Sequence, residues 1–274
     1  MQVVSISSLK GGVGKTSVTT GLASAALAAG IPTLVVDLDP HADASTALGV
    51  VPDGKLEVGR MLKAPKRVFL EDNVVPSAWV RRAAALNGQQ NRILDVAYGG
   101  SLSGVYDRPD LGRRDLRRLS IVLDGLEGYG LVLIDCPPSL NGLTRMAWAA
   151  SHRVLLVAEP GLFSVAGTER TLRAIQLFKQ EYAPKLAPAG IVANRVRPSS
   201  TEHGYRLDEM GQMFGPLLLE PHIPEVANWQ QIQGAAHAVH HWPGEAARGT
   251  SALYDELLGA VLRQSRDFRP RVAR

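Results

Sequence analysis

The chain has 274 residues, of which 45% are hydrophobic and 20% are charged, and its formal net charge is +4 at pH 7. This composition is typical of a soluble globular protein and excludes a chain that is disordered throughout. The one cysteine, Cys136, excludes an intramolecular disulfide and a metal site of several cysteines in one chain, which favours a reducing compartment.

Short apolar segments alternate with longer segments of helical periodicity, a pattern typical of βαβ units and a parallel sheet. Most of the apolar segments lack polar residues at every second position, so we expect strands that are buried on both faces. The sequence therefore predicts one α/β domain over residues 1–274, with a doubly wound, mostly parallel sheet flanked by helices. The predicted strands are 2–8, 33–39, 91–97, 131–136, 153–159, 189–195 and 217–223.

The helical segments are bounded by glycines and prolines, as Gly30 and Pro32 bound the first of them. Residues 50–109 fit the alternation less well, because four prolines and a Gly-Gly pair interrupt them. For these residues we expect short helices, one strand and loops. The predicted helices are Thr16–Ala29, Arg113–Leu126, Leu140–Ala150, Val165–Tyr182, Tyr205–Phe214 and Ala246–Arg263.

A glycine-rich sequence, GGVGKT, lies between the first predicted strand and the first predicted helix. In this context glycines let backbone N–H groups approach phosphates, and the helix N-terminus adds partial positive charge. We expect Lys15 to reach the β and γ phosphates of ATP and the Thr16 hydroxyl to bind Mg²⁺. The predicted phosphate-binding residues are Gly11, Gly12, Val13, Gly14, Lys15, Thr16 and Ser17.

This loop departs from the common pattern, because Leu9 occupies the position of the first glycine and Lys10 follows it. With that change the loop resembles the deviant Walker A motif of the ParA/MinD family of ATPases. Four further segments, VVDLDPHADAS, GLVLIDCPPSL, IVANRV and PHIPEV, resemble later landmarks of the same family, so the resemblance extends from Lys10 to about Glu225. It implies a P-loop NTPase fold of the SIMIBI type.

The resemblance gives the two lysines different roles. Lys15 would bind the phosphates of its own ATP, whereas Lys10 would reach across a nucleotide-sandwich homodimer to the phosphates of the partner subunit. A second cation that acts only when two subunits face each other makes association depend on ATP. The residues themselves also leave open that Lys10 is a solvated loop lysine.

Carboxylates end two of the predicted strands. Asp37 and Asp39 end the second strand, and the resemblance assigns the Mg²⁺ region to Asp37 and the orientation of the attacking water to Asp39. Asp135 takes the Walker B position, which holds Mg²⁺. A carboxylate at a strand end can instead form a turn or cap a helix, and that alternative stays open for each of the three.

Three further positions follow from the same resemblance. Asn194 and Pro224 are expected beside the nucleotide base. His41 stands where the family usually has glutamine, so the hydrolysis-linked switch is expected to behave differently. A metal site at His237, His240 and His241 is the less favoured interpretation of those histidines, because carboxylate or cysteine partners at a suitable spacing are missing.

Among the functions of this family, the sequence favours a DNA-partition ATPase. Cys136 alone does not provide the cysteines of the iron–sulfur relatives. We expect an ATP-bound dimer that binds DNA nonspecifically and a ParB-like partner or cargo adaptor that stimulates hydrolysis. The alternatives are a MinD-like membrane-associated or protein-cargo positioning ATPase and, with the same loop, a metabolic ligase. The nature of the cargo stays open.

Nonspecific DNA binding needs cations on one face and no base-reading motif. Arginines are frequent near the predicted base site and in the basic tail, residues 263–274. Arg113, Arg114, Arg117 and Arg118 also crowd one predicted helix. Each of these runs can equally be a solvated surface. The DNA-binding candidates are Arg195, Arg197, Arg206, Arg263, Arg266 and Arg269.

A membrane-associated function is not favoured. The last predicted helix has apolar residues at helical spacing, among them Leu257, Leu258 and Val261, but Asp255 and Glu256 interrupt the apolar face. Packing into the core explains this pattern better. Since no apolar run approaches the roughly 18 residues of a membrane span, we expect a cytoplasmic protein. The resemblance to DNA-partition ATPases implies that it associates with the nucleoid.

Overall fold

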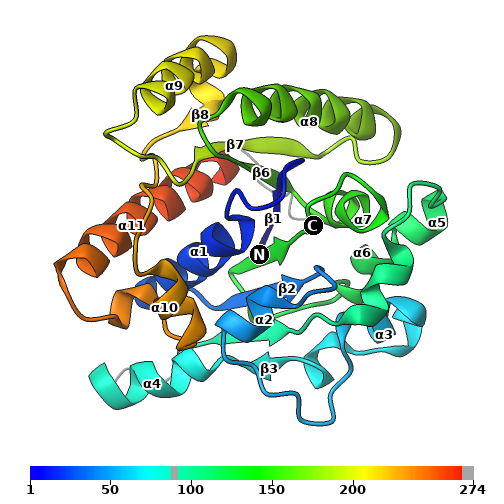
Figure 1. The fold of residues 1–274 in the computed structure, drawn as a ribbon. Coiled ribbons are helices and arrows are strands. Elements are labelled where there is room, and N and C mark those ends of the chain that lie inside the picture. Colours follow the sequence, from blue (N-terminus) through cyan, green and yellow to red (C-terminus); the bar gives the residue numbers. More distant parts are fainter. Residues whose placement is uncertain (88–91, 267–274) are drawn as a thin grey trace.

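The computed structural model describes residues 1–87 and 92–266. Its centre is one sheet of eight strands in the order β3-β4-β2-β5-β1-β6-β7-β8 (Figure 1). The paired strands run parallel, except at one edge, where β3 pairs antiparallel with β4. The strands are β1 (Gln2–Ser7), β2 (Thr33–Asp37), β3 (Val75–Pro76), β4 (Leu94–Ala97), β5 (Leu131–Asp135), β6 (Arg153–Ala158), β7 (Ala187–Ala193) and β8 (Leu218–Leu219).

Successive residues of the central strands enter two different cores, because side chains alternate between the faces of a strand. In β2, Leu34 and Val36 belong to one core and Val35 to the other, and none of the three is more than 1% exposed. The strands are therefore buried on both faces, as expected from their continuous apolar sequences. The predicted α/β class and doubly wound, mostly parallel sheet are confirmed.

Helices cover both faces of the sheet. The first core lies against α3, α6, α7, α8 and α9, and the second core lies against α1, α4 and α11. Figure 1 shows α1 and α11 side by side on one face. The helices are α1 (Lys15–Ala29), α2 (Asp43–Ala47), α3 (Val58–Lys63), α4 (Ala78–Asn87), α5 (Arg113–Leu116), α6 (Arg118–Val122), α7 (Gly142–Ala150), α8 (Leu162–Glu181), α9 (Thr201–Phe214), α10 (Trp229–Gly234) and α11 (Glu245–Arg266).

Three predicted elements differ markedly from the structure. The single helix expected over 113–126 is wrong, because α5 and α6 are separate short helices and Gly125, with φ 75°, follows the end of α6. The strand expected over 217–223 is reduced to β8, and Pro221, which has no N–H to donate, lies just beyond it. The helix expected from Tyr205 begins at Thr201 instead, where the Ser200 side chain accepts a hydrogen bond from the N–H of His203.

The segment from 50 to 109 contains short helices and loops, as predicted. It includes α3, α4 and one parallel strand, β4, and it also contributes the two-residue edge strand β3.

Short 3₁₀ helices occur in this segment and in two places later in the described chain. They are η1 (Pro65–Arg67), η2 (Leu70–Asp72), η3 (Ser101–Tyr106), η4 (Gly215–Leu217) and η5 (Val239–His241).

The apolar face of α11 packs into the second core. Tyr254, Leu257 and Val261 are at most 1% exposed, and they join residues of α1 in that core. The prediction that this helix packs in the core is confirmed. Within residues 1–87 and 92–266, no helix has both the length and the apolar composition needed to cross a membrane.

Candidate nucleotide site

Two adjoining cavities lie at the carboxyl ends of the central strands, where open α/β sheets bind ligands. The first, of about 410 Å³, includes Asn194 among its lining residues, and we call it the Asn194 cavity. The second, of about 650 Å³, is lined by Lys15 and Thr16, and we call it the Lys15 cavity. Gly12, Gly14 and Ser17 line both, so the two cavities form one elongated site around the start of α1.

The glycine-rich loop packs closely against Asn194, the residue that follows β7. Gly14 has φ 88°, and a Cβ atom placed on it would lie 2.3 Å from Asn194 Nδ2, so a side chain has no room there. Asn194 Nδ2 also donates a hydrogen bond of 2.8 Å to the carbonyl oxygen of Val13. Asn194 is therefore brought to the glycine-rich loop, and its expected place beside the nucleotide base stays a prediction.

Lys15 lies inside the site, with only 7% of the residue exposed. Its Nζ donates to Ser8 Oγ at 3.2 Å. Burial lowers the pKa of Lys15, and the nearby carboxylate of Asp135 opposes this shift. A buried cation with one hydroxyl partner is well suited to an anionic ligand.

Asp135 faces two threonine hydroxyls of α1. Its Oδ2 accepts a hydrogen bond from Thr16 Oγ1 at 2.8 Å, and its Oδ1 accepts one from Thr19 Oγ1 at 2.7 Å. Burial raises the pKa of Asp135, and the two hydroxyls and Lys15 oppose that change. The Thr16 hydroxyl and the Asp135 carboxylate are hard oxygen donors of the type that Mg²⁺ prefers. Sequence reasoning missed Thr19, although its position three residues after Thr16 places it on the same helix face.

Asp37 lies beneath the site and does not line either cavity within the described residues. Its Oδ2 accepts hydrogen bonds from the N–H and the hydroxyl of Ser45, at 2.8 and 2.7 Å, and its Oδ1 accepts one from the N–H of Asp39 at 3.2 Å. Burial, followed by the charge of Asp135, raises the pKa of Asp37. Asp37 thus fastens the loop that follows β2, and its expected part in Mg²⁺ binding stays a prediction.

Asp39 lines the Lys15 cavity beside His41. The Asp39 Oδ1 atom is 2.9 Å from His41 Nδ1 and also accepts a hydrogen bond from the His41 N–H at 3.0 Å. The hydrogen bond to Asp39 raises the pKa of His41, whose side chain is 78% exposed. His41 therefore occupies one oxygen of the carboxylate that is expected to orient water.

Lys10 points elsewhere. Its Nζ lies 3.9 Å from Glu159 Oε2, and its side chain is 51% exposed. Among the described residues that line the two cavities, Lys15 is present and Lys10 is missing. The two lysines of the loop thus have separate surroundings, one buried in the site and one at its rim.

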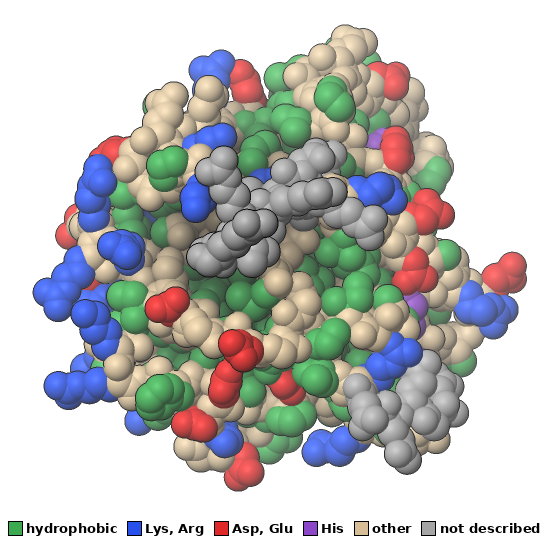
Figure 2. All heavy atoms as spheres, turned by 180° about the vertical axis from the view of Figure 1, so that it is seen from behind, with side chains coloured by type: hydrophobic (Ala, Val, Ile, Leu, Met, Phe, Trp, Pro, Cys, Tyr) green, Lys and Arg blue, Asp and Glu red, His purple; other side chains and the backbone are tan. Residues whose placement is uncertain are grey.

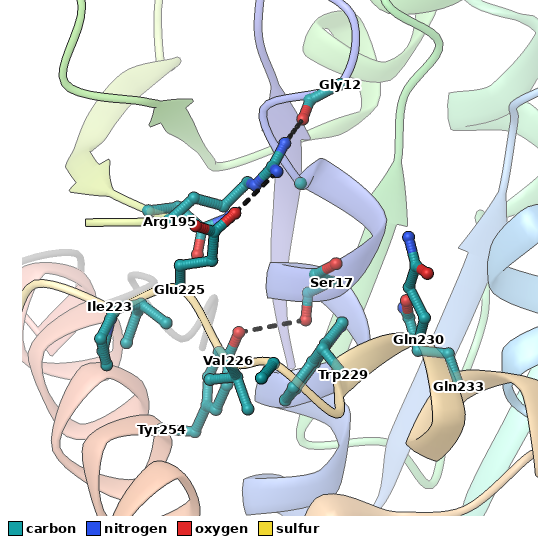
Figure 3. Close-up of a pocket in the computed structure, with 14 residues that line it drawn as sticks. Gly12, Ser17, Arg195, Ile223, Glu225, Val226, Trp229, Gln230, Gln233 and Tyr254 are labelled. Atoms are coloured by element: carbon teal, nitrogen blue, oxygen red, sulfur yellow. Dashed lines mark hydrogen bonds and ion pairs between the residues drawn. The ribbon is translucent and has the colours of Figure 1, made fainter. Parts of the chain in front are cut away.

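Aromatic side chains form one wall of the Asn194 cavity (Figure 3), and Pro224 also lines this cavity. The rings of Trp229 and Tyr254 lie 5.6 Å apart between centroids, and the Tyr254 hydroxyl donates to the carbonyl oxygen of Ser17 at 3.3 Å. Trp229 Nε1 is buried and has no hydrogen-bond partner within the described residues. Sequence reasoning missed this wall, although Trp229 lies only three residues after the end of the PHIPEV segment. Tyr254 lies on the distant α11 and carries no local signal.

An exposed ion-pair cluster closes the other side of the Asn194 cavity (Figure 3). Arg195 Nη1 donates to the carbonyl oxygen of Gly12 at 2.9 Å, and its Nη2 lies 2.9 Å from Glu225 Oε1. Arg197 Nε donates to Glu225 Oε2 at 2.8 Å and Arg197 also lies 3.9 Å from Glu159. The two arginines lie together, and Glu225 shares its charge between them.

The other DNA-binding candidates are dispersed. Arg206 on α9 pairs with Glu202 and Glu209, at 2.7 and 2.8 Å, and its side chain is 15% exposed. Arg263 is exposed on α11, and Arg266 is the last residue of that helix. Arg269 and the rest of the basic tail lie outside the described residues.

The histidines near the end of the chain make other contacts. His240 Nδ1 lies 2.7 Å from Ser24 Oγ, and its Nε2 lies 3.0 Å from Asp255 Oδ1. His237 packs edge-on against Trp242. In the part of the chain that the structure describes, no group of three or more His, Cys, Asp or Glu side chains is arranged to hold a metal ion.

Comparison with known proteins identifies a matching family model, sequence relatives and solved structures with a similar fold. A protein-family model described as an AAA domain matches residues 1–187. The chromosome partitioning protein ParA of Caulobacter vibrioides is 33% identical over 277 residues, which cover 100% of this chain and 98% of that protein.

Two solved structures share the fold over nearly the whole chain. A cobyrinic acid a,c-diamide synthase from Mycobacterium smegmatis, with a bound ATP analogue and magnesium, matches with a TM-score of 0.76 and 23% identity, over 98% of this chain and 97% of that one. A variant of McdA from Cyanothece, in complex with ATP, matches with a TM-score of 0.77 and 20% identity, over 100% and 99% of the two chains.

Proposed function

Because the chain belongs to the ParA/MinD family of P-loop ATPases, we propose that it is a DNA-partition ATPase that binds DNA as an ATP-bound homodimer. The observation that carries this proposal is the separation of the two loop lysines. Lys15 is buried in the site, whereas Lys10 lies half exposed at the rim beside Glu159. A cation outside its own cavity is available to the phosphates of a facing subunit.

The elongated site fits ATP with Mg²⁺. Lys15 and the loop from Gly11 to Ser17 would hold the phosphates, and Asn194, Pro224 and Trp229 would surround the base. Thr16 and Asp135 would hold Mg²⁺, with Asp37 in support, and the bound ion would neutralise charge on the β and γ phosphates.

Hydrolysis would depend on positioning and not on a covalent intermediate. Asp39 lines the Lys15 cavity and would orient the attacking water. His41 occupies one Asp39 oxygen at 2.9 Å and would compete with that water, so we expect slow turnover until another molecule rearranges this loop. A ParB-like protein or a cargo adaptor is the proposed stimulating partner.

The proposed dimer would bind DNA through contacts with its phosphates. The DNA-binding candidates near the site are Arg195 and Arg197, and the basic tail, residues 263–274, is a further candidate. We treat residues 1–274 as one ATPase domain with this tail, and we expect the dimer to lie on the nucleoid. Within the described residues the apolar face of α11 is buried, so this helix gives no support to the MinD-like membrane alternative.

The experiment that tests the proposal is binding to random-sequence duplex DNA with ATP, with ADP and without nucleotide, repeated over a range of salt concentrations. We expect tight binding with ATP only, and a log–log salt dependence with a slope near −0.9 for each phosphate contact. Size-exclusion chromatography under the same conditions should detect a dimer with ATP.

Absence of DNA binding under all three conditions would contradict the DNA-partition function. ATP-dependent binding to anionic vesicles in its place would favour the membrane-associated alternative. Turnover that depends on a small carboxylate or amide donor, and on neither DNA nor protein, would favour a metabolic ligase.

A further inference from the structure

Lys and Arg side chains gather on a face away from the ion-pair cluster. Figure 2 shows them along the left edge of the molecule, which corresponds to the side of α3, α5 and α6 in Figure 1. We call this the α3–α6 basic surface. It consists of Lys63, Lys66, Arg67, Arg113, Arg114, Arg117 and Arg118.

The centre of this surface is a shallow cleft of about 350 Å³. Its base is partly apolar, with Pro65 and Ile121, and no Asp or Glu lines it within the described residues. Five of its eight lining residues are cations: Lys63, Lys66, Arg67, Arg114 and Arg118. The cleft therefore has the charge of a site for an anionic ligand.

Arg118 fixes the shape of the cleft. Its Nη1 donates to the carbonyl oxygen of Leu62 at 3.0 Å, at the end of α3, and its Nη2 lies 2.7 Å from Asp115 Oδ1. One guanidinium thus ties α3 to the α5–α6 segment. Because these contacts use Arg118 internally, the cations left for a ligand are the others.

The remaining cations differ from the arginines near the nucleotide site. Arg113 has one long ion pair, 3.8 Å to Glu181, and its guanidinium lies over the ring of Tyr182, 5.1 Å from the centroid. Lys66, Arg67 and Arg114 are exposed and make no ion pair with any described residue, and the same holds for Lys63 and Arg117. By contrast, Arg195, Arg197 and Arg206 all pair with carboxylates. The cations of the α3–α6 basic surface are thus mostly unpaired among the described residues, whereas the three arginines Arg195, Arg197 and Arg206 are paired.

Cations that gather without carboxylates to balance them repel one another and destabilise the folded state. Binding of an anionic partner therefore accounts for this group of cations better than a role in folding does. We propose that the α3–α6 basic surface binds the phosphate backbone of duplex DNA, with Lys66, Arg67 and Arg114 as the main contacts. This inference rests on the proposed DNA-binding function and assigns the DNA contacts to this surface. A duplex presents one charge per about 1.7 Å of axis, which lets one ligand engage several separated cations at once.

The test compares the full-length protein with two variants that lose the same charge. The first, Lys66→Ala/Arg67→Ala/Arg114→Ala, removes the proposed contacts. The control, Arg170→Ala/Lys185→Ala/Arg248→Ala, removes three other exposed cations that form no ion pair with described residues. Fluorescence anisotropy with a labelled random-sequence duplex and ATP gives the affinity at several salt concentrations. Nucleotide affinity and ATP-dependent dimerisation are measured on the same samples.

We expect the first variant to lose about tenfold or more in DNA affinity, and its log–log salt slope to fall by roughly 0.9 for each contact removed. Nucleotide binding and dimerisation should be unchanged, because these residues lie outside both nucleotide cavities. The control should bind DNA within about twofold of the unmodified protein, as expected for cations that touch no phosphate.

Three results would overturn the inference. If the unmodified protein does not bind DNA with ATP, the proposed function fails and the inference fails with it. If the unmodified protein binds DNA and the first variant binds equally well, or both variants weaken equally, the function stands and the assignment of this surface is wrong. If the first variant keeps DNA binding but loses binding to anionic vesicles, the surface serves a lipid headgroup.

Discussion

The two ends of the nucleotide site hold charge in opposite ways. Around the Lys15 cavity, Lys15 and Asp135 are buried, and the charge of each opposes the pKa shift that burial causes in the other. Around the Asn194 cavity, Arg195, Arg197 and Glu225 form ion pairs that water can reach. Buried charges interact strongly and are costly to leave unpaired, whereas exposed pairs are screened and contribute little. Substitutions at the first end should therefore abolish function, and substitutions at the second should adjust it.

Lys15→Ala should have the largest effect. It removes the buried cation that is proposed to hold the phosphates and leaves Asp135 without its positive neighbour. We expect ATP affinity to fall by roughly a hundredfold or more, in line with the loss of a charge-assisted contact in a buried site. Isothermal titration calorimetry with ATP and Mg²⁺ measures it. The exposed Lys185→Ala is the control, and near-normal ATP affinity in Lys15→Ala would remove the distinction between the two ends.

Asp39→Ala should affect turnover and leave binding intact. If Asp39 orients the attacking water, hydrolysis should fall by about a hundredfold, which lies within the range for positioned proton-transfer groups. ATP should then accumulate in a long-lived dimer, seen by size-exclusion chromatography. Asp43→Ala, a nearby carboxylate that also lines the Lys15 cavity, is a matched control. Rapid hydrolysis by Asp39→Ala would contradict the role given to this residue.

Lys10→Ala separates binding from association. Since Lys10 does not line the cavity of its own subunit, ATP affinity should change by less than about fivefold, as expected for an exposed charge. The ATP-dependent dimer should disappear. Glu159→Gln is the informative companion, because it removes the internal partner of Lys10 and should strengthen dimerisation. A Lys10→Ala variant that forms a normal dimer would contradict the trans role of the lysine.

The sequence predicted the Lys15 end better than the Asn194 end, for a physical reason. The phosphate loop and its carboxylates follow strand ends within short motifs, so Lys15, Thr16 and Asp135 could be expected together in advance. Trp229 and Tyr254 come from α10 and α11, and only the fold brings these rings to 5.6 Å between centroids. Local patterns predict backbone sites well and distant side-chain contacts poorly.

The ion pairing of the arginines was the property that the sequence predicted least well. The sequence shows that Arg195, Arg197 and Arg206 are cations, but not that each lies within 3 Å of a carboxylate. It likewise shows a crowd of arginines over 113–118 without showing that Lys66 and Arg67 join them across a cleft. Pairing depends on the three-dimensional arrangement of elements, which periodicity does not contain.

His41→Gln tests a smaller effect at the Lys15 end. The pKa of His41 is raised above its ordinary 6.5, so its charged contact with Asp39 is fully present below pH 6.5 and is lost as pH rises through the raised pKa. Basal hydrolysis should therefore increase by a few-fold as pH rises through the raised pKa of His41 and Asp39 is released. The Gln variant should show a flatter profile. A pH profile identical to that of the unmodified protein would exclude His41 as its cause.

Glu225→Gln should have the smallest effect, and it tests the comparison from the other end. The substitution removes the charge that Arg195 and Arg197 share, but both arginines stay in contact with solvent and Arg195 keeps its hydrogen bond to the Gly12 carbonyl. ATP affinity should change by less than about fivefold, because exposed ion pairs are weak and screened. The same variant frees two cations near the site, so DNA affinity should rise slightly and not fall. If Glu225→Gln instead abolished ATP binding as Lys15→Ala is expected to do, the exposed cluster would be essential to the shape of the loop, and burial would no longer distinguish the two ends.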